Sequence, residues 1–158
     1  MKQNDLSTEE KTLRLFLSVR ESFGEIKEKV SLLKPYVELL VFSSGWALKI
    51  DEFKKLLSFK PEFIYKSNEK VYGISVLYKI DDDITIGIIA HEFAEIIAKE
   101  NNITEHEAID RICIERGFGE QLLFALQSDI LPGIVEREFI DRDDLERRIK
   151  NLKKLVQV

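Results

Sequence analysis

Cysteine and long apolar runs are both scarce in this chain of 158 residues. Its one cysteine, Cys113, excludes an intramolecular disulfide and any cysteine-based zinc cluster. Because Cys113 lies in a helical apolar pattern, we expect a buried, inert thiol. A single cysteine that forms no disulfide within the chain is usual in a reducing compartment, so we expect a cytoplasmic location. The most apolar stretch, residues 84–98, is too short and too often interrupted to span a membrane. The polar N-terminal residues lack the pattern of a secretory signal, so the sequence predicts no membrane partner.

Basic residues are not in excess either. Lysine and arginine number 24 against 29 aspartates and glutamates, which gives a net charge of −5. This balance provides no electrostatic footprint for nucleic acid, and we expect no nucleic-acid partner. Few glycines and prolines, a single methionine and abundant Lys, Glu and Ile are typical of thermophile proteins. The length fits a single domain over residues 1–158, in which the polar residues 1–10 are expected to be frayed or to begin a helix.

The spacing of apolar residues predicts an α+β protein, in which a small mixed sheet or a β-hairpin packs against a buried helix. Spacings of three and four residues predict a largely helical stretch from Leu13 to about Leu40. At the end of this stretch, residues 37–42 have the composition of a short strand. Residues 71–80 alternate and, together with residues 63–65, predict a β-hairpin. The apolar face of its second strand consists of Tyr72, Ile74, Val76, Tyr78 and Ile80.

Capping signals and apolar periodicity predict further helices. Asp81-Asp82-Asp83 supplies an N-cap for the most apolar helix, and Thr104 with Glu107 forms a capping box for the helix that follows. The predicted ranges are residues 50–59, 84–100, 105–116, 121–127 and 141–156. The last helix carries an apolar inner stripe of Leu145, Ile149, Leu152 and either Leu155 or Val156.

The stretch His91-Glu92-Phe93-Ala94-Glu95 lies in the middle of the most apolar helix. Within residues 84–98, His91, Glu92 and Glu95 are the only ionisable side chains. A buried charge is costly unless it is paired or bound to a metal. His91 and Glu95 are four residues apart and share a helix face, so both can converge on one ion. The pattern therefore predicts a metal site with His91 and Glu95 as two of its ligands.

A catalytic zinc ion takes three protein ligands and keeps one position open. Because the connection between the two helices is short, the second helix should fold back beside the first and bring its residues level with His91 and Glu95. Asp110 is the first candidate for the third ligand and His106 the second. Glu107 is the third, because the capping box already employs its carboxylate.

A different interpretation of the same residues needs no metal. His91, Glu92 and Glu95 would then form an internal hydrogen-bond network with Arg111, Arg116 or the backbone. The second histidine of the chain would be a solvated residue in the first turn of its helix.

The segment from Val71 to Arg116 resembles the zincins, the metallopeptidases whose active-site helix carries the motif H-E-x-x-H. In that family an outer strand precedes a buried active-site helix, and a following helix supplies the third metal ligand. By this resemblance, His91 matches the first metal ligand and Glu92 the base that activates water. Glu95 stands in the place of the second histidine.

The resemblance implies a metal-dependent hydrolase that acts on peptide bonds and binds its substrate as an added strand near Val71 to Tyr78. Zn²⁺ is the ion that the resemblance implies. The carboxylate of Glu95 makes the site richer in oxygen, which suits Mn²⁺ or Fe²⁺ better than an all-histidine site would. The alternative function is a catalytically inactive, zincin-like or helical module, in which the apolar stripes of the terminal helices serve partner binding or the formation of a homodimer.

Overall fold

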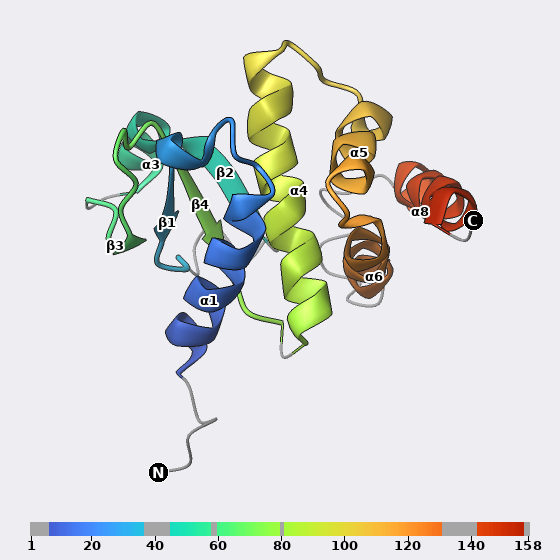
Figure 1. The fold of residues 1–158 in the computed structure, drawn as a ribbon, viewed down its shortest axis with the longest axis horizontal. Helices are drawn as coiled ribbons and strands as arrows, with labels where there is room; N and C mark the ends of the chain where they lie inside the picture. The colour runs from blue at the N-terminus through green and yellow to red at the C-terminus, as the bar shows by residue number, and fades with distance from the viewer. Residues whose placement is uncertain (1–6, 37–44, 58–59, 80, 131–141, 157–158) are drawn as a thin grey trace.

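The computed structural model describes residues 7–36, 45–57, 60–79, 81–130 and 142–156. Within them the chain forms six α-helices, one short 3₁₀ helix and a four-stranded sheet (Figure 1). The α+β class predicted from the sequence is confirmed. The strand predicted over residues 37–42 lies outside the described residues.

The sheet is mixed, with the strand order β2-β4-β1-β3. Strands β1 (Val30–Leu33) and β4 (Tyr72–Val76) form a parallel central pair. Strand β2 (Gly45–Lys49) pairs antiparallel with β4, and β3 (Phe63–Tyr65) pairs antiparallel with β1. The predicted hairpin is therefore wrong, because β3 and β4 are not partners and β4 lies inside the sheet.

The helix predicted from Leu13 to Leu40 is correct only in its first part. Helix α1 spans Thr8–Glu21, and a 3₁₀ helix, η1 (Lys27–Lys29), follows it. Strand β1 then occupies residues that were expected to be helical. All four of its residues are buried, so the strand shows no polar alternation that would distinguish it from a buried helix.

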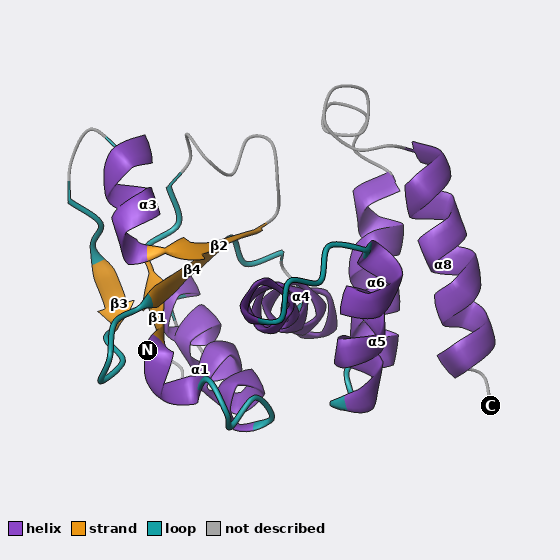
Figure 2. Ribbon diagram, turned by 90° about the horizontal axis from the view of Figure 1, so that it is seen from above, coloured by secondary structure: helices purple, strands orange, loops and turns teal. Residues whose placement is uncertain are grey.

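Helices cover both faces of the sheet, as Figure 2 shows. Helices α1 and α4 (Asp82–Glu100) cover one face, where Tyr72, Ile74 and Val76 join the main core as predicted. Helix α3 (Ile50–Leu56), which the sequence predicts, covers the other face. There Phe53 belongs to a smaller apolar cluster with Leu33, Tyr36, Ile50 and Leu57.

Helix α4 lies between the sheet and a helical layer that contains three further helices, the last of which lies outermost, on the side away from α4 (Figures 1 and 2). These are α5 (His106–Glu115), α6 (Gly119–Ile130) and α8 (Arg142–Val156). The inner stripe predicted for α8 is confirmed at Leu145, Ile149 and Leu152, which are buried, whereas Leu155 is 50% exposed. None of the described helices is long and apolar enough to cross a membrane.

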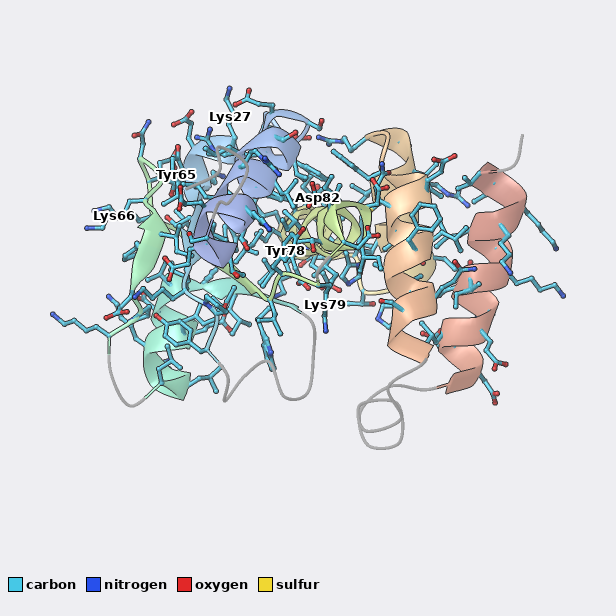
Figure 3. The ribbon with its side chains drawn as sticks, turned by 90° about the horizontal axis from the view of Figure 1, so that it is seen from below. Lys27, Tyr65, Lys66, Tyr78, Lys79 and Asp82 are labelled. Carbon is cyan, nitrogen blue, oxygen red and sulfur yellow. The ribbon has the colours of Figure 1, made fainter. Side chains whose placement is uncertain are left out.

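The start of α4 is fixed by several hydrogen bonds. Asp81 caps the helix as predicted, because its carboxylate accepts a hydrogen bond of 3.1 Å from the Ile84 N–H. The Tyr78 hydroxyl donates to Asp82 over 2.6 Å, and both residues lie beside the end of α4 in Figure 3. The capping box predicted for α5 is wrong: the residue before α5 makes no side-chain cap, and the Glu107 carboxylate accepts from Asn151 instead.

Helices α4 and α6 approach each other closely at Gly87. A Cβ atom on Gly87 would lie 2.1 Å from the carbonyl oxygen of Gln121, which belongs to the backbone of α6. Backbone cannot rotate away as a side chain can. Only glycine therefore permits this crossing, and the crossing fixes where α4 lies relative to the helical layer.

We predict that Gly87→Ala lowers the free energy of unfolding by about 1–3 kcal/mol, the usual cost of overpacking, although alanine favours the helix by itself. Urea denaturation measures the change. Gly24→Ala is the matched control, because the nearest atom to a Cβ at Gly24 lies 4.0 Å away. Equal stability of the two variants would show that the helices separate without cost.

Candidate functional site on helix α4

The predicted polar stripe of α4 lies along one side of the helix, next to strand β2. His91 Nε2 lies 3.3 Å from Glu95 Oε1, and the two side chains are 21% and 27% exposed. One turn further on, Lys99 donates a hydrogen bond of 2.7 Å to the carbonyl oxygen of Ala47 in β2. The stripe therefore forms a half-buried seam between the helix and the end strand of the sheet.

His91 and Glu95 perturb each other. Burial lowers the pKa of His91 and is the largest single effect, but the hydrogen bond with Glu95 and the negative charge of Glu92 together raise that pKa above its ordinary value. The hydrogen bond with His91 lowers the pKa of Glu95. The other ring nitrogen, His91 Nδ1, is buried and makes no hydrogen bond with any residue that the structure describes.

Glu92 turns toward strand β2. Its side chain is buried, and Glu92 Oε2 lies 3.0 Å from the position that a Cβ on Gly45 would occupy. A side chain at position 45 would also meet Val76 and Ile88. Glycine at the first residue of β2 thus makes the space that the Glu92 carboxylate fills.

Asp110, the first candidate for a third ligand, is engaged by an arginine of α8. Arg148 Nε and one of its terminal nitrogens donate to the two carboxylate oxygens of Asp110 over 2.9 and 2.8 Å. Both side chains are less than 10% exposed. A buried, bidentate pair of this kind holds the carboxylate firmly.

The other two candidates also contact α8. His106 Nδ1 lies 2.7 Å from the carboxylate of Asp144, and Glu107 accepts from Asn151 over 3.1 Å. The structure therefore brings His91, Glu92 and Glu95 together on one helix but directs Asp110, His106 and Glu107 elsewhere. Among the described residues, no group of three or more His, Cys, Asp or Glu side chains is arranged to hold a metal ion.

Sequence reasoning overlooked Arg148. Arg111 and Arg116 were the arginines expected beside buried carboxylates, but Arg116 pairs with Glu25 and packs over the ring of Phe23, and Arg111 is exposed. The sequence did contain a sign of its burial: Arg148 lies three residues after Leu145 and four before Leu152, and so on the buried stripe of α8. A charge on a buried stripe implies a buried partner.

Cys113 is fully buried, and burial raises the pKa of its thiol. The prediction of an inert thiol is confirmed in this respect, because the thiolate is the reactive form.

The strand edge next to this site belongs to β2, not to the segment from Val71 to Tyr78. That expectation is wrong, because β4 is paired on both sides. In β2 the carbonyl of Ala47 accepts from Lys99, and the N–H of Lys49 donates to Glu52. The peptide groups of Ala47 and Lys49 therefore point away from β4, toward the outer edge of the sheet.

Comparisons of this chain with protein-family models, with curated proteins and with solved structures find no match. The resemblance to the zincins therefore rests on the sequence motif alone.

We predict that Asp110→Ala lowers the free energy of unfolding by about 3–5 kcal/mol, because it leaves Arg148 charged and buried without its partner. Combining it with Arg148→Met should recover part of the loss. Urea denaturation gives both values. Glu107→Ala, an exposed change on the same helix, is the control and should cost less than about 0.5 kcal/mol. A cost for Asp110→Ala as small as that of the control would contradict a structural role for the pair.

The His91–Glu95 pair should make the stability of the metal-free protein depend on pH. The raised pKa of His91 contributes stability that is present below the ordinary value of 6.5 and is lost as the pH rises through the raised value. The lowered pKa of Glu95 contributes stability that is present above 4.5 and is lost as the pH falls through the lowered value. Both contributions are therefore present between pH 4.5 and pH 6.5, the ordinary pKa values of the two groups.

We therefore expect the difference in unfolding free energy between the wild type and His91→Gln to be largest at about pH 5.5 and to shrink by about pH 9. Denaturation at the two pH values in the presence of a chelator measures it. A difference that is the same at both would show that His91 and Glu95 are not coupled.

Proposed function

We propose that α4 and β2 form a zincin-like site that hydrolyses peptide bonds, in which His91 and Glu95 hold a divalent metal ion and Glu92 is the base. The observation that carries the proposal is the 3.3 Å separation of His91 Nε2 and Glu95 Oε1. A charge-assisted N–H···O bond is usually about 2.7–2.9 Å long, so the pair is loose for a hydrogen bond. Two ligand atoms bound at about 2.1–2.2 Å to neighbouring positions of an octahedral ion lie about 3.0–3.1 Å apart, and two bound at about 2.0–2.1 Å to a tetrahedral ion lie about 3.3 Å apart, so the observed spacing is close to what a shared ion needs.

The donors available determine which ion fits. A catalytic zinc ion takes three protein ligands, and the described residues offer two here, because Asp110 and His106 are engaged by Arg148 and Asp144. A complete zinc site does not fit these residues. One imidazole, one carboxylate and several waters suit Mn²⁺ or Fe²⁺ better. When bound, such an ion would make a bound water more acidic and polarise a peptide carbonyl.

Glu92 supplies the proton acceptor. Its carboxylate is buried next to the metal-binding pair, against the backbone of Gly45, where little solvent screens its charge. A carboxylate in that position can hold a proton taken from water and later return it to the leaving amine. The glycine at position 45 keeps this carboxylate next to the strand along which a peptide would lie.

The outer edge of β2 supports a peptide as the substrate. An extended peptide can add to an end strand through main-chain hydrogen bonds. In the structure the Lys99 ammonium group donates a hydrogen bond to the carbonyl oxygen of Ala47. Lysines at the edges of sheets often protect an end strand from pairing with another strand. A peptide bound there would displace the Lys99 ammonium group and extend past Glu92.

A second candidate function is a non-catalytic module for partner binding. The contacts of Asp110 and His106 favour it, because these two side chains bind Arg148 and Asp144 of α8 and so join α8 to α5. Exposed apolar side chains on the same helical layer, Phe124 and Leu155, would then contact a second copy of the chain or another protein.

Calorimetric titration with Mn²⁺ and Zn²⁺ tests the metal site. His91→Ala should weaken the binding of Mn²⁺ by at least about tenfold, and His106→Ala, the matched control at the other histidine, should change it by less than about twofold. If the wild type binds no stoichiometric metal, the hydrolase proposal is lost and the second candidate stands.

Glu92→Gln tests the catalytic step separately. It should retain the metal and lower the hydrolysis of a mixture of fluorogenic peptides by about 10²–10⁴-fold, the usual contribution of a general base. Hydrolysis at the wild-type rate by Glu92→Gln would remove Glu92 from the mechanism.

A further inference from the structure

A cavity of about 600 Å³ opens on the other side of the sheet from His91 and Glu92. Its walls come from helix α3, from Lys49 at the end of β2, and from two short segments, residues 60–61 just before β3 and residues 70–71 just before β4. Four lysines line it: Lys49, Lys54, Lys60 and Lys70. A single acidic residue, Asp51, accompanies them. A chain with a net charge of −5 therefore places four lysines around this cavity.

The charge in the cavity is largely uncompensated. Within the described part of the chain, Lys49, Lys60 and Lys70 form no salt bridge, and Lys54 reaches Asp51 only over 3.8 Å between two exposed side chains. An exposed pair at that distance contributes little. Four lysines that line one cavity give it a positive potential, which favours the binding of an anion.

The walls of the cavity strengthen its attraction for anions. Apolar residues, including Ile50 and Phe63, also line the cavity. Apolar walls have a low dielectric constant, so they concentrate the field of the nearby charges on whatever enters. Lys66 adds a further positive charge outside the cavity, because its ammonium group lies 5.5 Å from the centre of the Phe63 ring, at the outer end of the sheet (Figure 3).

The number of lysines indicates how much charge the ligand carries. One carboxylate would neutralise one ammonium group and leave the others repelling each other, whereas a diphosphate or triphosphate presents several negative charges within a short span. Lysine binds phosphate as a compact point charge and needs no fixed fork geometry. A volume of about 600 Å³ is within the range for sites that bind small molecules.

We propose that this lysine-lined cavity binds a small ligand that carries two or more linked phosphate groups. The phosphates would lie among Lys49, Lys54, Lys60 and Lys70, and any organic part of the ligand would lie against the apolar wall at Phe63. The proposal does not depend on the hydrolase function, because the sheet separates this cavity from helix α4.

Calorimetric titration of the full chain with inorganic tripolyphosphate tests the proposal. We expect saturable binding of one ligand per chain. The double variant Lys49→Gln/Lys70→Gln should weaken it by about tenfold or more, because each lost ammonium group removes a charge-assisted contact. The control Lys150→Gln/Lys153→Gln removes the same charge from exposed positions of α8 and should change the affinity by less than about twofold.

Lys60→Gln is a milder variant if the double variant does not fold, and it should weaken binding by about threefold or more. Adenosine triphosphate and adenosine, titrated in the same way, distinguish the sources of the phosphate. Tighter binding of the triphosphate than of tripolyphosphate would indicate a nucleotide, and equal binding an inorganic polyphosphate. No saturable binding, equal losses in the two double variants, or adenosine binding as tightly as its triphosphate would each overturn the proposal.

Discussion

Helix α4 is packed on two sides, and this constraint decides where its polar side chains can lie. The sheet and α1 cover one side, and α5 and α6 cover the other. At Gly87 the approach of α6 is so close that no larger side chain fits. One partly open side is the seam along β2, where the ionisable groups His91, Glu95 and Lys99 lie, and the half-buried Ile86 and Ile97 lie on the opposite side. Glu92 is adjacent but buried.

Two ionic arrangements on this framework differ in character. Asp110 and Arg148 form a buried pair in which both carboxylate oxygens and two guanidinium nitrogens are matched at 2.8 and 2.9 Å. Such a pair holds two helices together. His91 and Glu95 are further apart, partly exposed, and include a buried ring nitrogen that no described residue satisfies. Incomplete pairing beside an end strand of a sheet distinguishes a candidate site from a structural contact.

Local signals predicted the secondary structure well where residue types alternate over a long run or where a helix cap is present. The alternation at Tyr72, Ile74 and Val76 identified β4, and the N-cap at Asp81 placed the start of α4. The same reasoning failed for β1, a buried run of only four residues in which Val30 and Leu33 also fit the spacing of a helix. It also failed for the strand order, because the parallel pairing of β1 with β4 joins segments about forty residues apart in sequence, and no local pattern encodes such a pairing.

The candidate site was predictable to the extent that it depends on one helix. A spacing of four residues placed His91 and Glu95 together. The position of Asp110 on the next helix was also inferred, but its partner Arg148 comes from a helix 38 residues further along the chain. Arg148 would compete with a metal ion for the Asp110 carboxylate, and only the tertiary structure shows that the two residues meet. The zincin motif could therefore suggest the ligands on α4 but not a complete set.

The most direct test of the account is the anomalous diffraction of crystals grown with Mn²⁺. The account predicts one peak between His91 Nε2 and Glu95 Oε1, at about 2.0–2.3 Å from each, with Asp110 still bound to Arg148. A peak at His106 and Asp144 instead, or none at His91 under saturating Mn²⁺, would contradict it.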